Sequence, residues 1–327
     1  MLGDSGTEPA ARSRAFIRGS RMSGIRRPRV GLALGSGSAR GWAHIGAIRA
    51  LEEAGVRPDL VCGTSIGALV GAAYAAGELD RFEQWALGLG FSEVIAYMDV
   101  SLGSGLIKGE RLREFFRRQF ADRPVGDLAI PFASVATSLH TGAEVWLREG
   151  STVDAVRASI ALPGLFAPVP CEGSVLVDGG LVNPVPVSLA RAMGADVVIA
   201  VDLSSDMLGR HLRAEPPPQA SAGDVTDWIR KLQSSLGTLI PASSPEGPEM
   251  PSMLDVLASS INIMQVRISR SRMAGEPPDL TIAPRLAHLG LLDFHRAQEA
   301  IEEGKRAVKR VAYGLAALNG DAWPSQA

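Results

Sequence analysis

The chain has 327 residues, of which 46% are hydrophobic and 21% are charged, so it can bury a sizeable core in one large domain or two small ones. Its formal net charge of −2 lacks the basic excess of general nucleic-acid binders, so we expect no nucleic-acid partner. The two cysteines, Cys62 and Cys171, form no C-x-x-C pattern and no disulfide framework, which favours a reducing, cytoplasmic setting.

The N-terminal arm, residues 1–28, is basic. Residues 1–29 carry seven arginines against Asp4 and Glu8, and they lack the apolar core of a signal peptide. We interpret the arm as disordered and solvated, with attraction to anionic lipid headgroups as the alternative. The sequence has no apolar run of about 18 residues, the length typical of a transmembrane helix, so any membrane contact is expected to be peripheral.

Short strands and helices alternate along the chain. Residues 29–34 and 59–62 have the pattern of buried strands, and residues 41–54 and 66–76 have the pattern of helices. Strand–helix alternation with short connections predicts βαβ units and a parallel sheet. Further strand candidates lie at 131–138, 144–147, 175–177 and 196–202, and further helix candidates at 186–193 and from 254 onward.

A glycine- and serine-rich loop, residues 35–41, lies between the first strand and the first helix. Such a loop exposes several backbone N–H groups together, so it can hold a phosphate or an oxyanion. A dinucleotide fingerprint starting at Gly35 would need a sixth-place glycine, where the chain has Arg40, and the G-K-[ST] of a P-loop is missing. We therefore favour an oxyanion hole, with a plain turn as the alternative.

The segment Gly63-Thr64-Ser65-Ile66-Gly67 matches G-x-S-x-G between a strand and a helix. This is the context of a nucleophile elbow, in which a sharp turn exposes the serine hydroxyl. The N–H groups that open the following helix favour a developing negative charge. We therefore predict a nucleophilic Ser65, with a tight turn that holds an incidental serine as the alternative.

Asp178-Gly179-Gly180 follows the short apolar strand at 175–177. An aspartate at a strand end, followed by two glycines, allows close approach by chain or substrate. Asp-Gly is also common in turns, so this motif alone is a weak signal.

An insertion is predicted at about residues 204–251. Its two ends are rich in proline, serine and alanine, as linkers are. The segment between them is predicted to be a helix, either docked on the core or acting as a mobile lid or interfacial helix at a lipid surface. Its apolar residues recur within a stripe about 120° wide, namely Val225, Trp228, Ile229, Leu232, Leu236, Leu239 and Ile240.

Together, the three motifs resemble the patatin-like phospholipase family, which includes the esterase domain of neuropathy target esterase. The resemblance covers about residues 29–202, and residues 254–305 also look like the C-terminal part of bacterial members. It implies a three-layer α/β/α fold with a mainly parallel central sheet over residues 29–327. It also implies a serine acyl-ester hydrolase for lipids, of phospholipase A or lysophospholipase type, that needs no cofactor or metal.

The resemblance implies a role for each motif residue. Ser65 is the nucleophile and Asp178 the base of a dyad without histidine, and N–H groups of Gly37, Ser38 and Ile66 form the oxyanion hole. The supporting motif residues are Ser36, Arg40, Gly41, Gly63, Gly67, Gly179 and Gly180.

The loop departs from the family pattern in one respect. Family members usually have three successive glycines where this chain has Ser36-Gly37-Ser38. Serine supplies the same N–H but tolerates a positive φ poorly, which leaves the loop conformation open. Arg40 beside it reads as a surface residue or as a cation near the site. The resemblance suggests that the apolar stretch around Phe166 lines an acyl pocket, with a core role as the alternative.

A carboxylate can replace the usual histidine base. Serine is a weak nucleophile that needs a base, and desolvation raises the basicity of a carboxylate in a dry site. The alternative enzyme is an α/β-hydrolase with a Ser-His-Asp triad, for which His288 and His295 fall late enough in the chain. A third alternative is a lipid-binding module without turnover, which the intact Ser65 and Asp178 argue against.

Overall fold

The computed structural model describes residues 27–90, 114, 117, 122–206 and 253–318, except for residues 164 and 172. Residues 1–26 of the predicted arm and most of the predicted insertion, including its apolar stripe, lie outside the described residues. In the part of the chain that is described, no helix has both the length and the apolar character that a membrane crossing requires.

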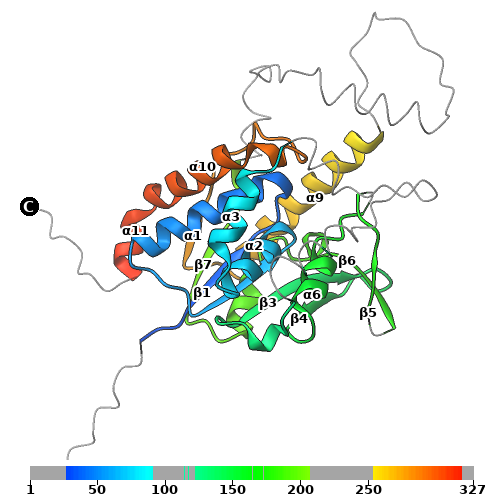
Figure 1. The fold of residues 1–327 in the computed structure, drawn as a ribbon, viewed down its shortest axis with the longest axis horizontal. Helices are drawn as coiled ribbons and strands as arrows, with labels where there is room; N and C mark the ends of the chain where they lie inside the picture. The colour runs from blue at the N-terminus through cyan, green and yellow to red at the C-terminus, as the bar shows by residue number, and fades with distance from the viewer. Residues whose placement is uncertain are drawn as a thin grey trace, which may run out of the picture.

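Eight strands of the described residues form one sheet: β1 (Val30–Leu34), β2 (Leu60–Thr64), β3 (Phe132–Ser138), β4 (Glu144–Leu147), β5 (Val169–Cys171), β6 (Ser174–Asp178), β7 (Val197–Val201) and β8 (Leu280–Ile282). Their order is β5-β6-β3-β2-β1-β7-β8, with β4 also paired to β3 (Figure 1). Strands β3, β2, β1, β7 and β8 pair in parallel, whereas the pairs β3–β4, β3–β6 and β5–β6 are antiparallel. The predicted, mainly parallel sheet is therefore confirmed.

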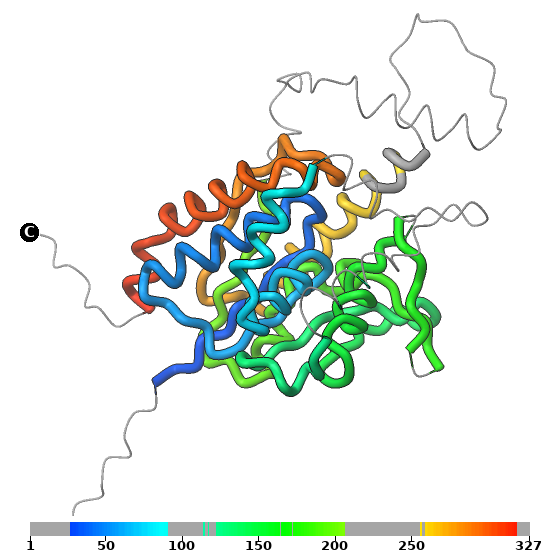
Figure 2. Tube along the Cα trace, viewed as in Figure 1, coloured from blue at the N-terminus to red at the C-terminus, as the bar shows by residue number. Residues whose placement is uncertain are grey.

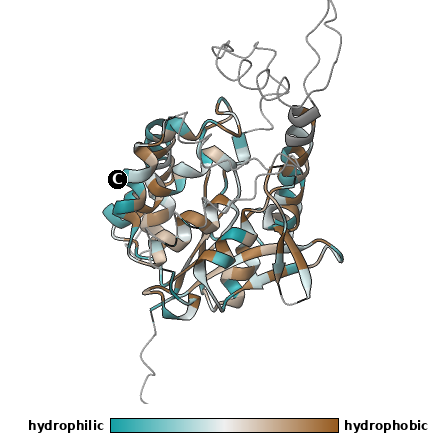
Figure 3. Cartoon of the chain, turned by 45° about the vertical axis from the view of Figure 1, so that its right-hand side comes forward, coloured by the Kyte–Doolittle hydropathy of each residue, from teal (hydrophilic) through white to brown (hydrophobic). Residues whose placement is uncertain are grey.

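Helices cover both faces of this sheet, as the traces in Figures 1 and 2 show. The larger core lies under α1 (Ala43–Glu53), α2 (Ile66–Ala75), α3 (Leu79–Leu87), α6 (Thr152–Ser159) and α10 (Ala297–Arg310), and the smaller core lies under α7 (Val187–Ala192). Leu32 and Leu34 of β1 enter the larger core and Ala33 enters the smaller one, as the two-residue period of a strand requires. In Figure 3 the hydrophobic colour accordingly gathers on the strands. The described residues also form the helices α9 (Met253–Gly275) and α11 (Ala312–Leu318) and the short 3-10 turns η1 (Ser38–Trp42), η2 (Val125–Asp127), η3 (Gly179–Leu181) and η5 (Phe294–Arg296).

The strand register brings the C-terminal ends of β2 and β6 together. Val135 of β3 pairs with Thr64 of β2, and the next residue, Ala136, pairs with Asp178 of β6. Both β3 residues also pair with β4, which occupies the opposite edge of β3. Strands β2 and β6 therefore pair with the same edge of β3, and their chains run toward each other. Their ends meet where Ser65 follows Thr64.

Two glycines allow α1 and α10 to pack backbone against backbone. A Cβ on Gly46 would lie 1.8 Å from the carbonyl oxygen of Ile301, and one on Gly304 would lie 2.0 Å from that of Ala43. This contact holds the C-terminal helices on the domain. The segment before α10 thereby reaches the first loop, where Trp42 Nε1 donates to the carbonyl oxygen of Phe294 at 3.0 Å.

Candidate active site

Ser65 occupies the sharp turn between β2 and α2. Its backbone has φ 57° and ψ −125°, a conformation that a non-glycine residue adopts rarely and at a cost of about 1–3 kcal/mol. A Cβ on Gly63 would lie 2.3 Å from the carbonyl oxygen of Gly67, and one on Gly67 would lie 2.2 Å from that of Leu34. Close backbone contacts therefore require both glycines of the predicted elbow.

Ser159, the last residue of α6, holds the elbow from the neighbouring helix. Its hydroxyl accepts the N–H of Ser65 at 2.9 Å and donates to the carbonyl oxygen of Val135 at 2.6 Å. The bond satisfies the N–H of a residue that belongs neither to the strand ladder nor to the helix. Ser159 could not be predicted from the sequence, because no local motif marks a serine that acts across 94 positions.

Asp178 lies directly against the Ser65 hydroxyl. Ser65 Oγ donates to Asp178 Oδ2 at 2.5 Å, and the N–H of Gly180 donates to Oδ1 at 2.7 Å. The side chain of Asp178 is completely buried. Burial raises the pKa of Asp178 to about 6, and the hydrogen bonds from Ser65 and Gly180 limit the rise. The carboxylate is therefore a stronger base than that of an exposed aspartate.

The backbone around Asp178 is fixed by its neighbours on the sheet. Thr137 Oγ1 donates to the carbonyl oxygen of Asp178 at 2.8 Å. A Cβ on Gly179 would lie 2.2 Å from the carbonyl oxygen of Val135, so this position excludes a side chain. Gly180 in turn supplies the N–H that orients the carboxylate.

The loop at residues 35–41 divides its N–H groups into two sets. Within the described residues no acceptor is assigned to the N–H groups of Gly37 and Ser38. Ile66 opens α2, so its N–H has no acceptor inside the helix. A Cβ on Gly41 would lie 2.1 Å from the Ile66 side chain, which keeps the loop close to α2. In the other set, the N–H groups of Gly35, Ser36, Ala39 and Arg40 are bonded to backbone carbonyl oxygens.

Ser38 does adopt the left-handed conformation, with φ 52°. Its hydroxyl donates to the carbonyl oxygen of Leu291 at 2.5 Å, a bond that a glycine could not make. Gly37 has extended backbone, and a Cβ there would lie 2.6 Å from Leu203. Serine at position 38 thus combines backbone strain with an added anchor.

Arg40 is buried beneath the loop with 2% of its surface exposed, so the surface interpretation is wrong. Its Nε donates to the carbonyl oxygen of Gly37 at 3.2 Å, and its Nη2 donates to Asn262 Oδ1 at 3.2 Å. Burial lowers the pKa of Arg40 to about 10, and the nearby charge of Asp202 opposes that shift. The guanidinium therefore remains charged at neutral pH and ties the loop to α9.

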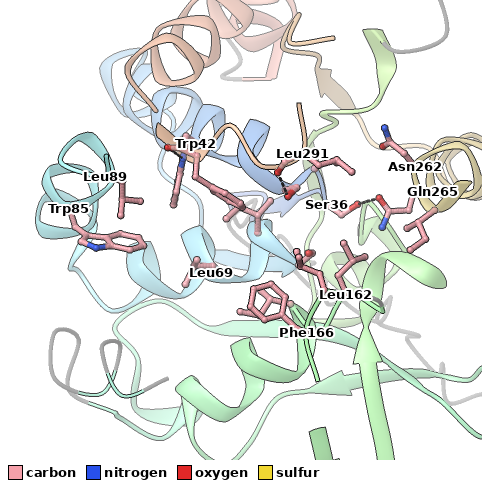
Figure 4. Close-up of a pocket in the computed structure, with 18 residues that line it drawn as sticks. Ser36, Trp42, Leu69, Trp85, Leu89, Leu162, Phe166, Asn262, Gln265 and Leu291 are labelled. Carbon is pink, nitrogen blue, oxygen red and sulfur yellow. Dashed lines mark hydrogen bonds between the residues drawn. The ribbon is translucent and has the colours of Figure 1, made fainter. Parts of the chain in front are cut away.

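Helix α9 makes a second contact with the loop. The hydroxyl of Ser36 donates to Gln265 Oε1 at 3.2 Å (Figure 4). Asn262 and Gln265 both line the cavity beside the loop. The sequence showed only that this helix resembles the C-terminal part of the family, and neither side chain was singled out for the site.

A cavity of about 110 Å³ opens beside Ser65. Apolar and aromatic side chains make up most of its wall, with Trp85 and Leu89 on one side and the two polar residues of α9 on the other (Figure 4). Phe166 lines the cavity, as the resemblance suggested. The site therefore combines a buried carboxylate, a serine hydroxyl and free N–H donors with an apolar chamber.

Within the described residues, no histidine contacts the dyad. Among the described residues, no histidine is hydrogen-bonded to Ser65 Oγ, whose partner is Asp178. His44 is fully buried under the loop, where its Nε2 lies 2.7 Å from the carbonyl oxygen of Gly35 and burial lowers its pKa to about 4. His288 pairs with Glu299 at the surface, and His295 is exposed.

Comparison with known proteins assigns the family. Residues 32–191 match the family model described as patatin-like phospholipase. An NTE family protein of Mycobacterium tuberculosis is 33% identical over 335 residues, which cover 87% of this chain and 91% of that protein. The chain therefore belongs to the patatin-like phospholipase family and is a lipid ester hydrolase.

Two longer relatives match over part of their length. Patatin-like phospholipase domain-containing protein 6 of Homo sapiens is 39% identical over 184 residues, which cover 54% of this chain and 13% of that protein. Lysophospholipase NTE1 of Pyricularia oryzae is 30% identical over 302 residues, which cover 88% of this chain and 18% of that protein. The chain thus corresponds to a small part of each of these two proteins.

Proposed function

We propose that the chain hydrolyses acyl esters of lipids through a Ser65–Asp178 dyad. The observation that carries this proposal is the 2.5 Å hydrogen bond from Ser65 Oγ to the buried Oδ2 of Asp178. The raised pKa of Asp178, about 6, supports the role of base, because the carboxylate is ionised at neutral pH yet more basic than usual.

The reaction follows in two balanced steps. Asp178 takes the hydroxyl proton while Ser65 Oγ attacks the ester carbonyl, and the leaving alcohol departs with that proton. A water molecule then attacks the acyl-serine and gives a proton to Asp178. The fatty acid leaves as Ser65 recovers its proton.

The oxyanion of each tetrahedral intermediate is assigned to the loop. The N–H groups of Gly37, Ser38 and Ile66 supply donors that are free of competing acceptors in the described part of the chain. Such preorganised donors stabilise charge that develops in the transition state. Arg40 adds a buried positive charge beneath the same loop.

A lysophospholipid or phospholipid is the substrate class that we propose. The apolar cavity fits an acyl chain, and the names of two relatives contain lysophospholipase and phospholipase. We further propose peripheral contact with the lipid surface. Its support is the exposure of Ile263 and Met264, at 57% and 49%, on the helix whose Asn262 and Gln265 line the cavity.

Release of fatty acid from a lipid panel tests this proposal. Vesicles of phosphatidylcholine, lysophosphatidylcholine micelles and a triacylglycerol emulsion would be given to the wild type, Ser65→Ala and Ser271→Ala. We expect Ser65→Ala to lose nearly all activity with its Tm preserved, while Ser271→Ala, a change at an exposed serine, retains it. Activity of Ser65→Ala within about tenfold of wild type would exclude the nucleophile, since removal of such a residue costs far more in serine hydrolases.

A further inference from the structure

A second cavity of about 40 Å³ lies beyond the first one. Its wall is mostly apolar, with Ala72 and Ala73 of α2, Ala76 directly after that helix, and Val153 and Val156 of α6 among its lining residues. Neither the dyad nor the oxyanion loop contributes to it. The mechanism above therefore leaves this space without a role.

The two cavities follow one another along the same pair of helices. Ile66, the first residue of α2, lines the first cavity, and Ala76, which directly follows that helix, lines the second. Residue Val153 of α6 lines the second cavity, and Ile160, just beyond the end of that helix, lines the first. The chain of α6 therefore runs opposite to α2, and the space between the two helices leads away from the nucleophile.

Leu69 stands at the boundary, because its side chain lines both cavities. Figure 4 shows it between the Trp85 side and the Phe166 side of the first cavity. Phe82 of the second cavity packs against Trp42 and Trp85 of the first, with ring centroids 5.7 and 5.4 Å apart. The boundary between the two cavities thus includes the apolar side chains of Leu69 and Phe82.

The length of the space between α2 and α6 matches that of one acyl chain of a membrane lipid. From Ser65 to Ala76 the helix rises about 17 Å, at 1.5 Å per residue. The hydrocarbon core of a bilayer is about 30 Å thick, so the chain of one leaflet spans about 15 Å. An acyl group esterified to Ser65 would therefore reach the far cavity with its terminal carbons.

Several polar groups at the far end already have partners, while the guanidinium of Arg123 lies 4.0 Å from Glu78 with 45% of its side chain exposed. Ser151 Oγ donates to Asp122 Oδ1 at 2.7 Å, and the N–H of Val153 donates to the same oxygen at 3.3 Å. Thr152 Oγ1 donates to the carbonyl oxygen of Arg123 at 2.7 Å. An apolar occupant fits these surroundings.

We propose that the second cavity binds the distal end of a long acyl chain, and that Leu69 is the residue that sets the preference for chain length. The proposal rests on the dyad function above and adds the chain length of its substrate. Short acyl chains occupy the first cavity only, whereas long ones displace the Leu69 side chain and fill both.

Hydrolysis of p-nitrophenyl esters in detergent micelles, from butanoyl to hexadecanoyl, tests the proposal through the ratio of kcat/KM for the longest and shortest chains. Ala73→Leu fills the second cavity and is expected to lower this ratio at least about tenfold, since several methylene groups lose their buried site. Leu69→Ala removes the partition and is expected to raise the ratio. Ala316→Leu makes the same change as Ala73→Leu at an exposed position on α11 and serves as control.

Thermal unfolding of each variant separates a change of specificity from a loss of folding. A ratio that stays at the wild-type value in both folded variants would overturn the acyl path while leaving the dyad intact. If Ala73→Leu fails to fold, the ratio of Leu69→Ala alone decides, and an unchanged ratio contradicts the proposal. Ester hydrolysis that survives Ser65→Ala would instead contradict the proposed function itself.

Discussion

Two serines, Ser65 in the elbow and Ser38 in the oxyanion loop, are the non-glycine residues with positive φ in the described part of the chain, at 57° and 52°. They are held in different ways. Ser65 is fixed mainly by adjacent sequence, since Gly63 and Gly67 allow its turn and β2 and α2 flank it, and one long-range hydrogen bond to Ser159 is added. Ser38 is anchored from a distance, by a hydrogen bond to Leu291, 253 positions away. Local sequence thus encodes the nucleophile, whereas the C-terminal segments shape the loop.

The largest effect is expected from a substitution that disrupts the turn at Ser65, the serine that is fixed mainly by adjacent sequence. Gly67→Ala places a Cβ about 2.2 Å from the backbone oxygen of Leu34, which cannot rotate away. We expect a loss of at least about 10³-fold in kcat/KM or failure to fold, because the strained turn depends on that contact. Gly126→Ala, where a Cβ meets open space, is the control. Near-normal kcat/KM and Tm in Gly67→Ala would show that the elbow tolerates a wider turn.

A smaller effect is expected from a substitution that removes long-range contacts of the oxyanion loop. Arg40→Met keeps the apolar stem but removes the donors to Gly37 and Asn262. We expect kcat to fall roughly 10- to 100-fold, with KM for a short ester changed less than about threefold, because the loop donors act on the transition state. Steady-state kinetics with p-nitrophenyl butanoate measures kcat and KM separately. A change confined to KM would mean that Arg40 positions substrate instead of the loop.

The smallest effect is expected at Ser38. Two substitutions there separate the cost of the strained backbone from the contribution of the hydrogen bond to Leu291. Ser38→Ala loses the hydroxyl bond to Leu291 and keeps the strained backbone, whereas Ser38→Gly loses the bond but relieves the strain. A non-glycine residue in the left-handed region costs about 1–2 kcal/mol, so the glycine variant is expected to be the more stable of the two by about that amount. Urea unfolding measures the difference. Equal stability of the two variants would show that φ at this position relaxes.

The contrast between local and long-range contacts also explains which features could be predicted from the sequence. The parallel β1–β2 pair and the elbow follow from short-range patterns, and the fold class is confirmed. The antiparallel direction of β6 could not be predicted, because its pairing with β3 joins segments about forty residues apart, far beyond a local pattern. The edge strand β5 pairs with β6 over Val169–Cys171, which is too short to show a strand pattern. Ser159, Asn262 and Gln265 were missed for the same reason, since each acts on a residue that is distant in the sequence.

The pH dependence of Ser65 labelling by a fluorophosphonate tests the dyad most directly. Because Asp178 must be ionised to accept the proton, the wild-type rate is expected to rise through a midpoint near pH 6 and to fall about tenfold for each unit below it. Asp178→Asn should lower the rate at pH 8 at least about 10³-fold, and His288→Ala should leave it unchanged. Labelling of Asp178→Asn at close to the wild-type rate, or its loss in His288→Ala, would contradict the assignment of Asp178 as the base.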